Sequence, residues 1–430
     1  MEKKSSIVKR TAEEWLEFGD EAFNKGDYET AFQYYKNALN ENASSPFAYF
    51  KAGNALTMLK RWNEAIKYFV GTITLDPTFS FAYYKKGHCH LELLQINEAI
   101  KEFTIAVEIN PNFALAYYRR GYCLYLAKKF EEAIADFSKA IELNPSHAEP
   151  YIYRGNCYFH LGNYDLAISD YDKAIELDPD NPKVFISRGV VNIKLANFKE
   201  AIGDFTLAIS IDQNNYLAYN YRGFCLNQLK QFELAIEDFL RVIELKSNFV
   251  DAYNNIGISY VGLKKYEKAL EYFDKAAEIN PKSATIYFNR GNANLHLKNY
   301  VEAIIDYDKA LTIEPNYAYA YYGRGNANFA LEQYRDALRD YSKAIALNPN
   351  FFNAYIARGN VYLKIKHLKK ALEDFTIAVE LAPENPFGYL NRAIAYRTDN
   401  IFSYAVSDLN EFLRLYGKED KLAEKVRTWI

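Results

Sequence analysis

Residues 284–317, ATIYFNRGNANLHLKNYVEAIIDYDKALTIEPNY, decide the fold because a unit of this length and pattern recurs along nearly the whole chain. Gly291 has counterparts every 34 residues from Gly19 to Gly359, and only the last unit departs from this, with Ala393. Self-similarity at such a period indicates a stack of identical supersecondary units. With this Gly at position 8, the twelve repeats run 12–45, 46–79, 80–113, 114–147, 148–181, 182–215, 216–249, 250–283, 284–317, 318–351, 352–385 and 386–419.

Each repeat carries the pattern of two helices. Apolar residues at positions 4, 8 and 11, and again at 20, 24 and 27, follow the 3.6-residue period. Position 20 is always Ala, and small residues at 8 and 20 let two backbones approach closely, which offsets the helix cost of Gly of about 1 kcal/mol. Pro at position 32 of eight repeats ends the second helix, and Thr11 with Glu14 forms a capping-box pattern at the start of the first. We therefore predict an all-α protein.

The period and the Gly, Ala and Pro positions resemble the tetratricopeptide repeat family over residues 12–419. The resemblance implies an α-solenoid, a right-handed superhelix of helix–turn–helix units, with a concave face lined by the first helix of each repeat and a role in binding partner proteins. RNA-binding pentatricopeptide repeats have a similar shape, but the 34-residue period, the small-residue pattern and the charge argue against them.

Both ends of the chain fit a solenoid, which needs polar caps. Leu422, Val426, Trp429 and Ile430 form one apolar stripe, so residues 420–430 are predicted to be a capping helix over the last repeat. Residues 1–11 are predicted to be an N-terminal tail.

The overall composition excludes several classes of function. The 430 residues carry a formal net charge of −3, which gives no reason to expect affinity for nucleic acid or for an anionic membrane. No apolar stretch approaches the roughly 20 residues of a membrane span. The basic start, MEKKSSIVKR, lacks the apolar run of a secretory signal peptide, so we expect a cytoplasmic protein.

Positions 7 and 23 vary together within a repeat. Every basic residue at position 7 has an acidic partner at position 23, as in Lys86 with Glu102, whereas apolar Ile256 has Tyr272. We expect a bidentate ion pair within each such repeat, and we expect replacement of both partners to be milder than removal of one. The predicted Arg–Asp pairs are Arg120–Asp136, Arg154–Asp170, Arg188–Asp204, Arg222–Asp238, Arg290–Asp306, Arg324–Asp340, Arg358–Asp374 and Arg392–Asp408.

No motif for chemistry is found. The four cysteines, Cys89, Cys123, Cys157 and Cys225, all occupy position 10, so they are predicted to be buried, unpaired thiols. The run His88-Cys89-His90 is a poor metal site because adjacent helical residues point in different directions. We find no nucleophile elbow or phosphate loop, and we predict neither enzyme, cofactor nor metal site.

By the resemblance, positions 2, 5, 6, 9, 12 and 13 face the groove. In the later repeats these positions carry many asparagines, whose amides offer two donors and an acceptor for the backbone of an extended peptide. The alternative is a solvated Asn-rich face. The candidate peptide-binding residues are Asn220, Asn254, Asn255, Asn289, Asn292, Asn326, Asn360 and Asn391.

In the early repeats the same positions are aromatic: Phe47, Phe50, Phe81, Tyr84, Tyr118, Tyr122 and Tyr125. This aromatic zone is a candidate second partner site or a contact between copies of the chain, since large apolar patches seldom stay exposed; packing between repeats is the alternative. The basic clamp by which related repeats bind chaperone tails is not assembled, because position 5 is never Lys and Lys85 stands where Asn is required.

The leading hypothesis is therefore a non-enzymatic scaffold that holds an extended peptide or partner segment in its groove. The runner-up is a structural subunit of a larger complex that uses the aromatic zone and the outer surface. An RNA-binding solenoid comes third.

Overall fold

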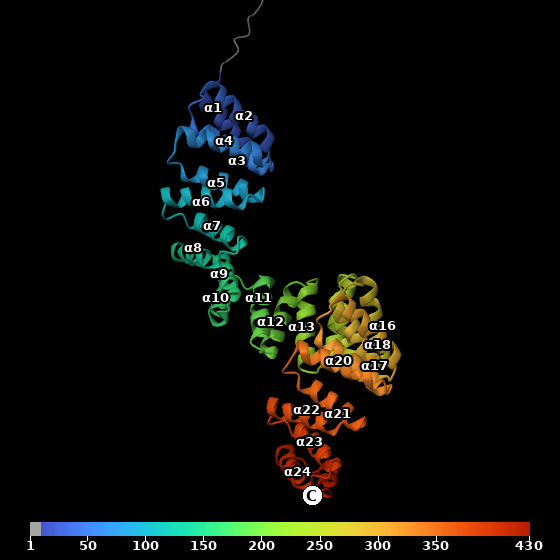
Figure 1. Ribbon diagram of the computed structural model, residues 1–430. Helices are drawn as coiled ribbons and strands as arrows, with labels where there is room; N and C mark the ends of the chain where they lie inside the picture. The colour runs from blue at the N-terminus through green and yellow to red at the C-terminus, as the bar shows by residue number, and fades with distance from the viewer. Residues whose placement is uncertain (1–9) are drawn as a thin grey trace, which may run out of the picture. The chain divides into compact units, whose positions relative to one another are not determined.

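The computed structural model describes residues 10–430, which contain twenty-five helices and no strand (Figure 1). The first helices of the repeats are α1 (Ala12–Asn24), α3 (Pro46–Met58), α5 (Ser80–Glu92), α7 (Ala114–Leu126), α9 (Ala148–His160), α11 (Pro182–Lys194), α13 (Tyr216–Gln228), α15 (Val250–Gly262), α17 (Ala284–His296), α19 (Ala318–Ala330), α21 (Phe352–Lys364) and α23 (Pro386–Thr398). The second helices are α2 (Tyr28–Glu41), α4 (Trp62–Leu75), α6 (Ile96–Ile109), α8 (Phe130–Leu143), α10 (Tyr164–Leu177), α12 (Phe198–Ile211), α14 (Phe232–Leu245), α16 (Tyr266–Ile279), α18 (Tyr300–Ile313), α20 (Tyr334–Leu347), α22 (Leu368–Leu381) and α24 (Phe402–Tyr416), followed by α25 (Lys421–Arg427).

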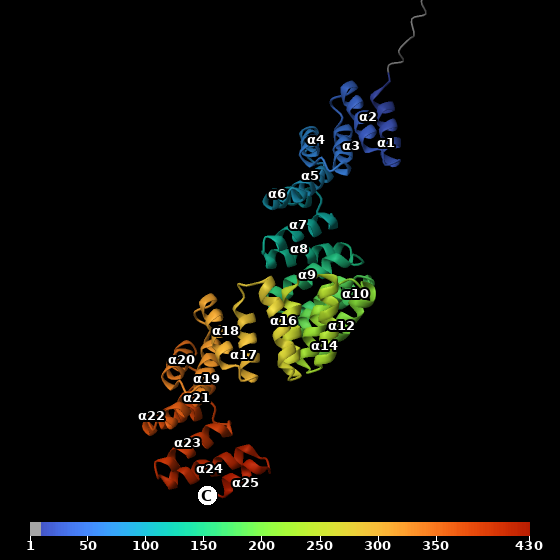
Figure 2. The same cartoon turned by 90° about the vertical axis from the view of Figure 1, so that its right-hand side faces the viewer.

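The helices form two compact units, the first ending at Asn215 and the second beginning at Tyr216. Within each unit every first helix packs against the second helix of its own repeat, and each second helix packs against the next repeat. Figure 1 shows the helix pairs from α1–α2 to α7–α8 stacked in chain order in the first unit, and Figure 2 shows α21 to α25 in chain order in the second. The predicted all-α solenoid architecture is thus confirmed. None of the described helices combines the length and apolarity that a membrane span requires.

Close contact between position 8 and position 24 holds the two helices of a repeat together. A Cβ built on Gly291 would lie 2.9 Å from Cε1 of Tyr307, so no larger residue fits without movement. The last repeat has Ala393 at position 8, and there Leu409 replaces the aromatic ring at position 24; both are fully buried. The one departure from Gly is therefore matched by a smaller partner.

The turn between the two helices was not predicted in detail. Its residue at position 15 adopts a positive φ in every repeat, yet only Gly26 and Gly162 are glycines there. The other ten are Lys60, Leu94, Lys128, Ala196, Lys230, Lys264, Lys298, Glu332, Lys366 and Asn400. The left-handed conformation ends the first helix, and for a residue with a Cβ it is strained.

The two ends of the repeat array carry a capping box and a short C-terminal helix, and that helix is shorter than predicted. Thr11 accepts from the Glu14 amide at 3.2 Å, and the Glu14 carboxylate accepts from the Thr11 amide at 2.7 Å, so the capping box is confirmed. At the other end Val426 is buried against the last repeat. Ile430 is half exposed, because α25 ends at Arg427 and the helical stripe does not continue. The rest of the predicted tail, residues 1–9, lies outside the described residues.

Candidate partner-binding surfaces

All eight predicted Arg–Asp pairs come together within their own repeats. In the first of them, Nε and Nη2 of Arg120 donate to the two oxygens of Asp136, each at 2.7 Å. Lys86 and Glu102 form the expected equivalent at 2.8 Å. All eight aspartates are buried. These arginines therefore join the two helices of their repeats.

Two further partners of this ion pair are not predicted from the sequence. In at least six of the eight pairs the third guanidinium nitrogen also donates to position 25 of the preceding repeat, as in Arg290 Nη1 to Asp274 at 2.6 Å. In three repeats an Asn at position 11 also donates to the aspartate, as in Asn294 Nδ2 to Asp306 at 3.0 Å. A comparison of position 25 with the following position 7 would have found the first, since Asp, Ser or Thr stands there before each such Arg. The arginine thus links two repeats.

All eight candidate asparagines are partly exposed, but they differ in what their amides contact. Asn289 Nδ2 donates to Asn254 Oδ1 at 3.0 Å, which joins two neighbouring repeats. Asn391 donates to the carbonyl of Phe387 in its own helix at 2.7 Å. The Oδ1 atom of Asn220 is buried without a partner among the described residues. Asn255 and Asn360 make no side-chain hydrogen bond within residues 10–430.

Buried tyrosines orient two of these amides. The hydroxyl of Tyr307 donates to Oδ1 of Asn292 at 2.8 Å, and Tyr341 does the same for Asn326 at 2.8 Å. With its oxygen occupied, each amide directs its two N–H donors away from the tyrosine. This relation was also readable in the sequence, because every repeat with Tyr at position 24 has Asn or Asp at position 9.

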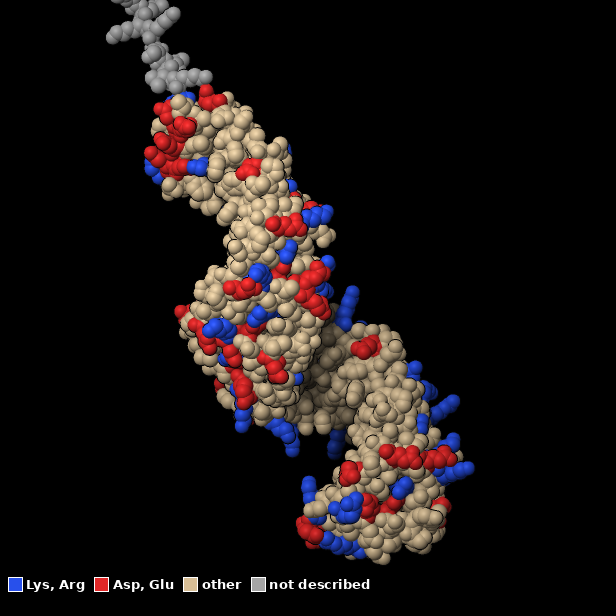
Figure 3. Space-filling view, turned by 90° about the vertical axis from the view of Figure 1, so that its left-hand side faces the viewer, with Lys and Arg blue, Asp and Glu red and all other residues tan. Residues whose placement is uncertain are grey.

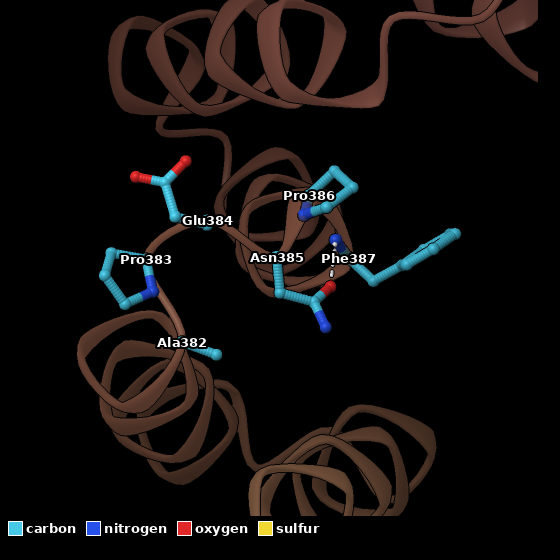
Figure 4. A pocket seen from close by; sticks show the side chains of 6 residues that line it. All are labelled: Ala382, Pro383, Glu384, Asn385, Pro386 and Phe387. Carbon is cyan, nitrogen blue, oxygen red and sulfur yellow. Dashed lines mark hydrogen bonds between the residues drawn. The ribbon is translucent and has the colours of Figure 1, made fainter. Parts of the chain in front are cut away.

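A hollow of about 360 Å³ lies on three successive first helices of the second unit. Phe329 of α19, Asn360 and Leu363 of α21, and Ile394 of α23 contribute to its walls. Lys364 and Thr398 also line it, and the apolar residues together with the amide of Asn360, which is unbonded within the described residues, suit a peptide side chain whose backbone is held nearby. A larger hollow at residues 382–387 is formed by a single turn, where Asn385 caps α23 through the Phe387 amide (Figure 4). The shape of this second hollow follows from the turn that begins α23, so we do not treat it as a candidate ligand site.

The aromatic zone divides into buried and exposed members. Tyr84 and Tyr118 are each only 7 % exposed, and Tyr84 packs against Phe113 with ring centroids 5.0 Å apart. Phe47 and Phe81 are 59 % and 50 % exposed. Phe50, Tyr122 and Tyr125 are partly buried against neighbouring rings. Packing within a repeat, and against Tyr153 of the next repeat for Tyr118, thus accounts for the tyrosines at position 5, but not for the phenylalanines at position 2.

The cysteines are buried and unpaired, as predicted. Burial raises the pKa of the Cys89 thiol to about 12, which makes it unreactive. Among the described residues no group of three or more His, Cys, Asp or Glu side chains could hold a metal ion.

Family models for the tetratricopeptide repeat match residues 16–78, 82–113, 114–147, 148–181, 216–249, 250–283, 284–317, 318–351 and 341–373. The chain belongs to the tetratricopeptide repeat family. No curated protein matches the sequence significantly.

Three solved structures illustrate the similarity. The crystal structure of the APC/C hetero-tetramer Cut9–Hcn1 is 12 % identical, covers 97 % of this chain and 96 % of that chain, and has a TM-score of 0.50. YrrB, described as a TPR protein with an unusual peptide-binding site, is 32 % identical over 42 % of this chain and 92 % of its own, with a TM-score of 0.38. Yeast Tom70 is 16 % identical over 97 % of this chain and 99 % of its own, with a TM-score of 0.43.

Proposed function

We propose that the protein is a non-enzymatic interaction scaffold whose second unit, residues 216–430, holds an extended peptide along its first helices. The observation that carries this proposal is the set of oriented amides. Asn292 and Asn326 have their oxygens bound to buried tyrosine hydroxyls, so each offers donors outward. The backbone carbonyls of an extended peptide are the matching acceptors, and they are present whatever the peptide sequence.

The test uses the full chain and a displayed library of extended peptides, with affinities measured by fluorescence polarisation. The variant Asn255→Ala with Asn289→Ala and Asn292→Ala removes three amides from neighbouring repeats. At about 1 kcal/mol for each hydrogen bond, we expect a loss of roughly 100-fold in affinity. The matched control replaces three exposed asparagines in the turns between repeats with Ala: Asn248, Asn316 and Asn350.

A second variant, Tyr307→Phe, removes only the hydroxyl that orients Asn292. We expect weaker peptide binding of about fivefold, since one hydrogen bond that fixes the amide is lost. If both groove variants bind peptides as tightly as the control variant, the eight candidate asparagines, here called the Asn face, are solvated and do not bind the peptide. The alternative of a structural subunit, which uses other surfaces, would then be favoured.

A further inference from the structure

A different surface in the first unit combines cations with exposed apolar side chains. Position 6 is Lys51, Lys85 and Arg119 in repeats 2 to 4, and position 2 of the same helices is apolar. Positions 2 and 6 are four residues apart, so the apolar and the basic side chain of each helix share one face. No other repeat pairs an apolar position 2 with a cation at position 6. We call Phe47, Phe81, Leu115, Lys51, Lys85 and Arg119 the basic–apolar strip.

The apolar half of the strip is open to solvent. Phe47, Phe81 and Leu115 are 59 %, 50 % and 40 % exposed. They lie on α3, α5 and α7, which pack side by side in that order. Three large apolar side chains in a row on neighbouring helices indicate a contact surface rather than scattered exposure.

Two of the three cations have no acidic partner. Lys51 forms an ion pair with Asp20, which also accepts from Tyr35. By contrast, Lys85 and Arg119 have no carboxylate within ion-pair distance among the described residues. Arg119 lies over the ring of Tyr118 at 5.4 Å, and its Nε is buried without a hydrogen-bond partner. A partly buried cation without a counter-charge favours an incoming anion.

The surroundings of these two cations are positive. His88, one turn after Lys85, has its pKa lowered by burial and by the charge of Arg119, although Glu92 acts in the opposite direction. Glu92 lies 3.8 Å from Nε2 of His88, and Glu149 of repeat 5 lies 2.8 Å from Nε2 of His147. Neither carboxylate neutralises Lys85 or Arg119.

We propose that the basic–apolar strip binds an acidic, apolar segment of a partner protein, with two carboxylates three residues apart on Lys85 and Arg119. Neighbouring first helices lie about 10 Å apart, as packed helices do. A polyproline II segment rises about 3.1 Å per residue with three residues per turn, so residues i and i+3 lie on one face about 9 Å apart. Apolar side chains of the same segment lie on Phe47 and Phe81.

A protein segment fits this surface better than nucleic acid. Only two cations of the strip lack an acidic partner among residues 10–430, and exposed phenylalanines line the strip. On the face that Figure 3 displays, acidic and basic side chains are interspersed and form no broad positive field. Nucleic-acid binding usually draws on many phosphate contacts. This proposal is independent of the Asn face, which belongs to the other unit.

The probe is a fluorescein-labelled peptide with Phe next to each of two Asp residues that are separated by Pro-Pro. Its affinity for the full chain is measured by polarisation. The variant Lys85→Met with Arg119→Met keeps the apolar stems but removes both charges. We expect about tenfold weaker binding for each cation removed. The control, Lys67→Met with Lys101→Met, makes the same charge change at exposed sites on α4 and α6.

Three comparisons complete the test. Peptides with Asn in place of Asp, or with only one residue between the two Asp, should bind about tenfold more weakly. The triple Asn→Ala variant of the second unit should bind the acidic peptide normally, which separates this proposal from the proposed function. Phe81→Ala, with the charges intact, should also weaken binding, so the outcome does not depend on the folding of one variant.

Equal affinity of the Lys85/Arg119 variant and its control would overturn the proposal, as would indifference to the Asp spacing. Displacement of the peptide by a labelled ten-residue oligouridine that binds more tightly would assign the strip to nucleic acid instead.

Discussion

The ion pair of repeat 11 allows a sharp test of how the repeats are held together. Arg358 donates to Asp374 at 2.9 and 2.7 Å and to Ser342 of the preceding repeat at 3.0 Å. The Asp374 side chain is 4 % exposed and that of Arg358 is 19 % exposed. We predict that Arg358→Ala is strongly destabilising, whereas Arg358→Ile combined with Asp374→Tyr is mild.

The magnitudes follow from what each change leaves behind. Arg358→Ala leaves the buried Asp374 carboxylate without its partner, which lowers the free energy of unfolding by about 3–5 kcal/mol. We expect a value near the lower end, because the arginine side chain is partly exposed to water. The double change gives repeat 11 the residue pair of repeat 8. There Ile256 is fully buried, and the ring centroids of Tyr272 and Tyr260 are 5.6 Å apart. Repeat 11 already has Tyr362 where repeat 8 has Tyr260. A well-packed apolar pair can replace an ion pair at a cost of about 1 kcal/mol or less.

The same double change in repeat 9 is a matched comparison. Arg290→Ile with Asp306→Tyr removes the acceptor of Asn294, which is buried. An unsatisfied buried amide adds about 1–3 kcal/mol, so this swap should be worse than the one in repeat 11. The cost of a double replacement therefore depends on whether an Asn at position 11 donates to the aspartate.

The assay is urea unfolding followed by circular dichroism, with hydrogen exchange of α21 and α22 to locate the effect, because solenoids can unfold locally. The expected order of destabilisation is Arg358→Ala first, then the repeat 9 swap, then the repeat 11 swap. If the repeat 11 swap is as damaging as Arg358→Ala, the ion pair is not replaceable and the reasoning fails.

Three further predictions concern the scaffold. Leu94→Gly should raise the free energy of unfolding by about 1 kcal/mol, because Leu94 holds a φ of 59° while 81 % exposed; an unchanged thermal midpoint would contradict this. Gly291→Ala should lower it by about 1–3 kcal/mol through the clash with Tyr307, which thermal unfolding would detect. Stability should also fall as pH rises above about 9, because the unfolded thiols ionise there, whereas the folded Cys89 thiol has a pKa of about 12. Slow reaction of the native thiols with a thiol reagent at pH 8 is the direct check.

Much of the fold could be predicted from the sequence, because every repeat uses the same contacts between its two helices. The contacts that define a repeat lie inside one helix pair. They involve Gly at position 8, Ala at position 20 and the linked residues at positions 7 and 23, and the twelve repeats of the chain can be compared with one another at each of these positions. The within-repeat partner of Arg290 was found in this way. The turn at position 15 was missed since Lys, Leu and Glu there give no sign of a left-handed conformation.

The candidate binding surfaces were harder to predict from the sequence, because the exposure and the bonding partners of each side chain depend on its surroundings in the folded chain. Tyr84 and Phe81 both contact the ring of Phe113, yet Tyr84 is only 7 % exposed and Phe81 is 50 % exposed. Lys51 and Lys85 occupy equivalent positions, yet only Lys51 finds an aspartate.

The sequence by itself therefore determined the period, the helix pairs and the ion pair within each repeat, because these contacts are local and recur. Only the tertiary structure decided which amides bond to a neighbouring repeat, as Asn289 does to Asn254, and which cations lack a partner. Those properties arise between repeats, where each side chain meets a neighbour that the repeat pattern does not specify.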